Sequence, residues 1–166
     1  DPYLGFLAAG IAGMALSVLY GLVVLRYRSD QIVAGTAINL FSMGIPPFFS
    51  KIWFDSTGST PPIPTENQFQ VAPLWITFGI IVLTFIIFKY SRFGIRLRFA
   101  GEHPEALQSA GVSVNLKRWQ GILMGGFLAG LAGGTLSIYL SSSFIRNMSA
   151  GRGFIALAAV ILGKWK

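Results

Sequence analysis

The chain has 166 residues, of which 53% are apolar and only 11% are charged, and its formal net charge is +7. Soluble proteins carry about 25% charged residues, and so short a chain could not bury this much apolar surface, which excludes a soluble globular fold. The absence of cysteine excludes disulfides and thiol ligands to a metal ion.

Five charge-free apolar runs predict the elements that cross a membrane. A helix needs about 20 apolar residues to cross a bilayer, so four runs are long enough and the fifth is too short alone. We expect an all-α fold, a polytopic transmembrane helical bundle that forms a single domain over 1–166. Because the chain starts at Asp1 without a methionine and stops just after a helical pattern, we expect a fragment of a larger protein. The expected spans are about 4–25, 31–50, 73–89 and 119–141, with a partial span at 153–163.

Lys and Arg indicate which side of the membrane each loop occupies, because they concentrate on the cytoplasmic side. Six of the thirteen lie within 89–118, which predicts a cytoplasmic loop at 90–118. The prolines of segment 51–72 forbid a helix there, and we expect it to be an external loop. This clustering indicates membrane topology rather than a nucleic-acid-binding surface. In this topology Arg146 and Arg152 would be external, against the charge bias.

A short polar helix is predicted inside the basic loop. Pro104 suits the first helical position, where its missing N–H costs nothing, and Glu105 in the first turn complements the helix dipole. Gly111 can end the helix in a left-handed cap. Since a short polar helix close to a bilayer has little to bury of its own, we expect it to dock a cytoplasmic partner. The residues expected to take part are Glu102, His103, Pro104, Glu105, Ala106 and Gly111.

Small residues recur at intervals of four in two of the expected spans, a spacing that lets helices approach closely in lipid. In the first span they are Gly5, Ala9, Gly13, Ser17 and Gly21. In the fourth they are Gly126, Gly130 and Gly134, with Gly125, Ala129 and Gly133 beside them.

The segment AGIAGMALS at 9–17 resembles AGLAGGTLS at 129–137, and the two copies would cross the membrane in opposite directions. Inverted repeats are common in transporters, with the substrate path near the repeat interface. The sequence therefore predicts inverted repeats, although Gly and Ala are common enough here for a chance match.

Polar groups within or beside the apolar runs are candidates for a solute path. Asn39, close to Thr36, either bonds a neighbouring helix or binds a hydroxyl-rich solute. At the last run, Asn147, Arg152 and Phe154 accompany glycines that loosen the backbone, as broken helices at transport sites require. Arg152 would supply positive potential at the outer mouth; alternatively, its long side chain only reaches toward the membrane surface.

The sequence gives little support for an enzyme or for a protein that holds a cofactor. His103 is the only histidine, and with no cysteine and few carboxylates no metal site can be built. The spans hold no His-bearing triad, and no glycine-rich phosphate loop ends in Lys-Ser or Lys-Thr. We therefore expect a chain that is not an enzyme, holds no cofactor and does not itself hydrolyse ATP.

Several blocks resemble one family in order and spacing. GIRLRFAGEHPEA at 94–106, followed by AGV at 110–112, resembles the cytoplasmic loop of bacterial ABC-importer permeases for branched-chain amino acids and simple sugars. DQIVAGTAIN at 30–39, FLAGLAG at 127–133 and NMSAGRGFIALA at 147–158 are similar to the branch that serves nucleoside and simple-sugar importers with basic-membrane-protein-type receptors.

The resemblance implies a permease of about twice this length, multi-pass in the bacterial cell (inner) membrane. It implies a second permease subunit, identical or homologous, and an extracytoplasmic substrate-binding protein. A cytoplasmic ATPase would hold ATP and Mg and couple through the helix within 101–111. The solute would be a nucleoside or a simple sugar. A secondary transporter or channel for a small polar solute is the alternative, although the four long runs lack the carboxylates that ion coupling usually needs. The third interpretation is a membrane scaffold that transports no solute.

Overall fold

The computed structural model describes residues 2–56, 59–62, 64 and 73–163, so part of the expected external loop at 51–72 lies outside the described residues. The described part is helical apart from turns and one isolated β-bridge, which confirms the all-α class. In chain order the helices are α1 (Pro2–Gly21), the π-helical turn η1 (Leu22–Arg26), α2 (Gln31–Phe54), α3 (Pro73–Tyr90), α4 (Arg92–Glu102), α5 (Pro104–Ser109), α6 (Val114–Thr135), the π-helical turn η3 (Leu136–Leu140) and α7 (Arg152–Leu162).

Three helical segments are long and apolar enough to cross a membrane: Tyr3–Arg26, Gln31–Phe54 and Val114–Leu140. Trp75–Tyr90 and Arg92–Glu102 make a fourth if they are counted as one span, although they meet at 74°. By itself α7 has 11 residues, about half of what a bilayer crossing requires. The fold is that of a multi-pass helical membrane protein.

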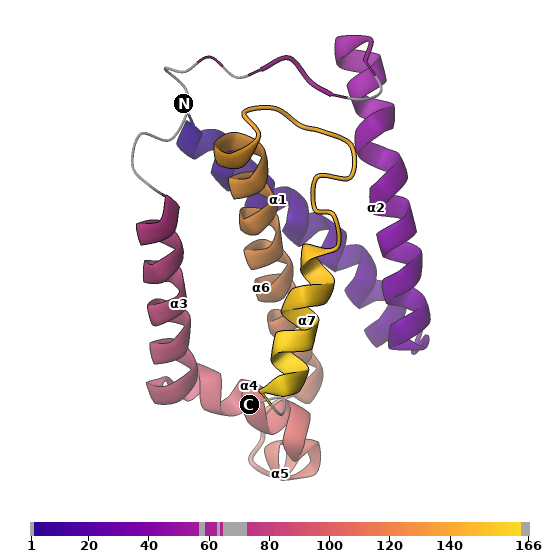
Figure 1. The fold of residues 1–166 in the computed structure, drawn as a ribbon. Helices are drawn as coiled ribbons and strands as arrows, with labels where there is room; N and C mark the ends of the chain where they lie inside the picture. Colours follow the sequence, from indigo (N-terminus) through magenta and orange to yellow (C-terminus); the bar gives the residue numbers. More distant parts are fainter. Residues whose placement is uncertain (1, 57–58, 63, 65–72, 164–166) are drawn as a thin grey trace.

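α1 and α6 form the most extensively packed pair and run antiparallel (Figure 1). Glycines permit this approach. A Cβ atom on Gly13 would overlap the backbone of Gly130, and one on Gly21 would lie 2.6 Å from the ring of Trp119. Because lipid tails are as apolar as leucine, burial alone does not drive helices together in a membrane, and close contact between backbones supplies the attraction.

One end of the bundle is strongly basic, and we call it the basic end. There α1 with η1 ends, α2 begins, α3 ends and α6 begins, and α4 and α5 lie across it (Figure 1). Ser91 starts α4 by accepting a hydrogen bond from the Phe93 N–H at 3.1 Å, which turns the chain sharply away from α3. The cationic residues at this end are Arg26, Arg28, Lys89, Arg92, Arg96, Arg98, Lys117 and Arg118.

At the opposite end two loops are held together. The Thr60 N–H donates to the Phe144 carbonyl at 3.0 Å, and the Phe144 N–H donates to Thr60 Oγ1 at 2.9 Å. The chain then turns back along the bundle, with positive φ at Asn147 (62°) and Gly151 (78°). As a result α7 begins part-way along α6 and ends near α4 (Figure 1).

Candidate functional site

α5 is fixed at the basic end by a small apolar cluster. Leu107 from α5, Ala100 from α4 and Val114 from α6 are buried together, with Val112 packed against them. Gly111 has φ +75°, so the left-handed turn predicted after this helix is present. This turn lets the Val112 N–H donate to the Leu107 carbonyl at 3.1 Å, which returns the chain toward α6.

The outer face of α5 is not covered by the described part of the chain. Pro104 occupies the predicted first-turn position and is half-buried, whereas Glu105 and Ala106 are exposed. Glu102, also expected here, ends α4 and pairs with Arg98, whose Nε donates to its Oε1 at 2.9 Å. His103 links the two helices and is exposed. α5 therefore presents one unpaired carboxylate within the described residues at this surface, that of Glu105.

The residues expected to line a solute path are not brought into one site. Asn39 and Thr36 lie exposed on α2, and the Thr36 hydroxyl bonds to carbonyls of its own helix, that of Ile32 at 3.1 Å and that of Val33 at 2.9 Å. The residues expected at the last span all lie exposed in the α7 region; they are Asn147, Arg152 and Phe154. Between the parts of α2 and α7 that the structure describes, no hydrogen bond or ion pair is formed.

A large cavity lies elsewhere, between α1, α3, α4, α6 and α7, with a volume of about 1270 Å³. Its wall is mainly apolar and carries three threonines. The hydroxyls of Thr84 and Thr135 donate to carbonyls of their own helices, each at 2.7 Å, which leaves their oxygens able to accept. The polar lining residues are Thr77, Thr84, Lys89, Arg98, Glu102 and Thr135.

The sequence pattern alone did not predict this cavity. The seven-residue interval between Thr77 and Thr84 places both on one face of α3, and that interval is the signal that could have found it. Thr135 belongs to a different helix, however, and only the tertiary arrangement shows that it shares the cavity.

The helical fold, the candidate spans and the basic end define a multi-pass membrane protein. The chain belongs to the family described as the permease component of branched-chain amino acid transport systems, which it matches over residues 1–166.

Individual relatives agree with this assignment. The chain is 32% identical to the guanosine ABC transporter permease NupQ of Bacillus subtilis, over 99% of this chain and 57% of that protein. It is 30% identical to a nucleoside ABC transporter permease of Lactococcus lactis, with the same coverage. A putative glucose ABC transporter permease of Haloferax volcanii is 29% identical over 99% of this chain and 55% of that protein. The chain thus spans little more than half the length of these relatives. No solved structure matches it significantly.

Proposed function

We propose that the chain is part of a permease subunit of an ATP-driven ABC importer for nucleosides or simple sugars. Family membership supports this role, as do the relatives, which are named as permeases for guanosine, nucleosides and glucose. ATP and Mg would be held by a partner ATPase. The basic end would face the cytoplasm of a bacterial cell, according to the charge bias of membrane proteins.

The observation that carries the proposal is the attachment of α5. Its exposed face is available to an ATPase, while Leu107 anchors its buried face against Ala100 of α4 and Val114 of α6. A displacement of α5 would therefore be transmitted to α6. Because the glycine contacts of α6 lock it against α1, the two helices would move as a unit, and ATP binding would be converted into a change of access across the membrane.

Two finer features belong to the same proposal. The first copy of the repeated motif lies in α1, and the second lies in α6 and the start of η3. α1 and α6 pack antiparallel (Figure 1), as a two-fold inverted relation requires. We propose that α2 and the α7 region complete the solute path together with segments outside this chain, a second permease subunit and an extracytoplasmic binding protein. The path residues would be Thr36, Asn39, Asn147, Arg152 and Phe154.

ATP-driven uptake by the reconstituted full-length permease, with its ATPase and binding protein, tests this proposal. Wild type should accumulate labelled guanosine or glucose only with ATP. Glu105→Arg should lower transport-coupled ATP hydrolysis about tenfold, because the arginine would either repel a positive charge of the ATPase or fail to fit against its surface. The control is Asp55→Arg, an equal charge reversal at the end of α2 that lies away from the basic end. This substitution should not change transport-coupled ATP hydrolysis.

The melting temperature of each variant separates a docking effect from misfolding. Uptake without ATP would favour a secondary transporter or channel instead. Unchanged coupling in Glu105→Arg would remove α5 from the mechanism, even if ATP-driven uptake is observed.

A further inference from the structure

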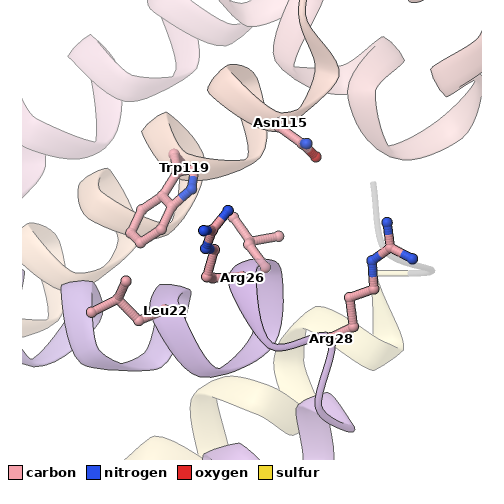
Figure 2. A pocket seen from close by; sticks show the side chains of 6 residues that line it. Leu22, Arg26, Arg28, Asn115 and Trp119 are labelled. Atoms are coloured by element: carbon pink, nitrogen blue, oxygen red, sulfur yellow. The ribbon is translucent and has the colours of Figure 1, made fainter.

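A second cavity, of about 310 Å³, opens between the end of η1 and the start of α6 (Figure 2). It lies apart from both the large threonine-bearing cavity and α5, with which it shares no lining residue. It combines two guanidinium groups, an amide, an indole and two leucines. The lining residues are Leu22, Leu25, Arg26, Arg28, Asn115 and Trp119.

Local structure sets these side chains around the cavity. The π-helical turn ends where the Tyr27 N–H donates to the Leu22 carbonyl at 3.1 Å. Arg28 follows with φ +54°, a left-handed conformation that is uncommon for a residue other than glycine. On the facing helix, the ring of Trp119 packs over Gly21, where no Cβ intervenes. Figure 2 shows Arg26 near Trp119, with Asn115 on the adjacent turn of α6.

The positive charge of this cavity is not neutralised by the described part of the chain. Neither Arg26 nor Arg28 forms an ion pair or a hydrogen bond there. The nearest acid in sequence, Asp30, is engaged as the cap of α2: its Oδ1 accepts from the Ile32 N–H at 2.7 Å and the Val33 N–H at 3.2 Å. Two arginines beside a cavity with no carboxylate lining it favour an anionic ligand.

We propose that this cavity binds the headgroup of an anionic phospholipid. The guanidinium group of Arg26 and that of Arg28, which Figure 2 shows at separate places beside the cavity, can each bind a phosphate through paired N–H donors. The Asn115 amide can bond a headgroup hydroxyl or phosphate oxygen. Leu22 and Leu25 give the cavity an apolar side along which the first acyl carbons can lie.

The depth of the cavity favours a lipid over an acidic partner protein. Leu22, Leu25 and Arg26 belong to the candidate span Tyr3–Arg26, so the cavity begins at the last turn of a membrane helix. Tryptophan side chains prefer the headgroup level of a bilayer, which is where Trp119 would place the cavity. A docking protein would first meet α4 and α5, which lie across the basic end (Figure 1). This inference does not depend on which solute, if any, the protein transports.

Lipid titration of the purified full-length protein tests the proposal. The melting temperature is followed in detergent as phosphatidylglycerol or phosphatidylcholine is added to wild type, to R26Q/R28Q and to R96Q/R118Q. The last pair is the matched control: it removes two exposed arginines from the same end but none from the cavity. We expect phosphatidylglycerol alone to stabilise wild type, and we expect its midpoint concentration to rise about tenfold in R26Q/R28Q and little in R96Q/R118Q.

Three results would overturn the proposal. If both double variants lose the stabilisation by phosphatidylglycerol to the same extent, the lipid responds to general surface charge and not to this cavity. Equal stabilisation by inorganic phosphate would assign the cavity to a free anion. No effect of phosphatidylglycerol on wild type, together with stabilisation by the ATPase that R26Q/R28Q abolishes, would assign the arginines to protein docking.

A second measurement serves if R26Q/R28Q does not fold. Tryptophan emission is compared between wild type and Trp119→Phe in the presence of phospholipids with brominated chains. The emission that disappears in Trp119→Phe should be quenched more strongly by brominated phosphatidylglycerol than by brominated phosphatidylcholine. Equal quenching by the two lipids would mean that the cavity does not select an anionic headgroup.

Discussion

The α1–α6 pair and α2 are built from similar apolar sequence, yet they pack in opposite ways. Along α1 and α6, Cβ atoms on Gly13 or Gly130 would overlap the facing backbone. Along α2, no atom of another element that the structure describes lies within 4 Å of a Cβ built on Gly35 or Gly44. Only Ala34 and Ser50 of α2 are buried. One pair is thus a closely fitted contact, whereas α2 offers most of its surface to lipid or to another protein segment.

The difference shows what organises this fold. Apolarity alone places both regions in the membrane, because each satisfies its backbone hydrogen bonds within a helix. Shape then decides which helices associate, since residues without large side chains let two backbones meet. We infer that the α1–α6 pair is the rigid unit of the chain and that α2 depends on its surroundings for its position.

The largest expected effect comes from filling the α1–α6 contact. In Gly130→Ala the new Cβ would overlap the Ala9 carbonyl oxygen and lie 3.0 Å from the Gly10 Cα. Since backbone cannot rotate away as a side chain can, we expect a loss of about 1–3 kcal/mol in stability. The full-length protein would show this as a lower melting temperature in detergent.

The matched control is Gly133→Ala, on the same helix. Among the described residues, no atom of another element lies within 4 Å of a Cβ built on Gly133, so alanine should be neutral or add up to about 1 kcal/mol through helix propensity. Equal destabilisation by the two substitutions would mean that a further segment covers the Gly133 face, and the contrast between the two faces of α6 would disappear.

The spacing of small residues in the sequence predicted most of the α1–α6 contact. Four-residue spacing identified Gly126, Gly130 and Gly134 as a packing row, and the structure confirms that each faces α1. Spacing could not separate this row from Gly125 and Gly133 beside it, which have no neighbour from another element in the described part of the chain, because both rows have the same period. The decision depends on which side the partner helix occupies, and that is a tertiary property.

The candidate site was predictable only where the determinants are local. The ends of α5 follow from Pro104 and Gly111, because caps act within one turn of a helix. The burial of Leu107 could not be predicted in the same way, since its partners come from α4 and α6. The start of α7 part-way along α6 depends on the long turn before it (Figure 1). The apolar pattern of the sequence did not predict the course of that turn. The assignment of path residues stays a prediction.

A smaller effect is expected at the start of α2. Asp30→Ala removes the acceptor for the Ile32 and Val33 N–H groups and should cost about 1 kcal/mol. Because little else holds this helix, we expect the loss to appear locally, as faster hydrogen exchange over the first turn of α2, with little change in the melting temperature. Asp30→Asn keeps an accepting oxygen and is the control. A full drop in melting temperature would instead show that α2 unfolds together with α1 and α6.

The smallest effect, and the most direct test of the contrast, is expected for Gly44→Ala in α2. Gly44 is exposed, and a Cβ there would meet no described atom within 4 Å, so alanine should raise stability by about 0.5 kcal/mol through helix propensity. Measured in the isolated full-length permease, a small gain would agree with an unpacked α2. Suppose instead that Gly44→Ala is harmless in the isolated subunit but prevents its association with a second permease subunit. Then the open face of α2 is a subunit contact of the same kind as α1–α6. Both regions would pack closely, α1 and α6 against each other within the chain and α2 against a second subunit.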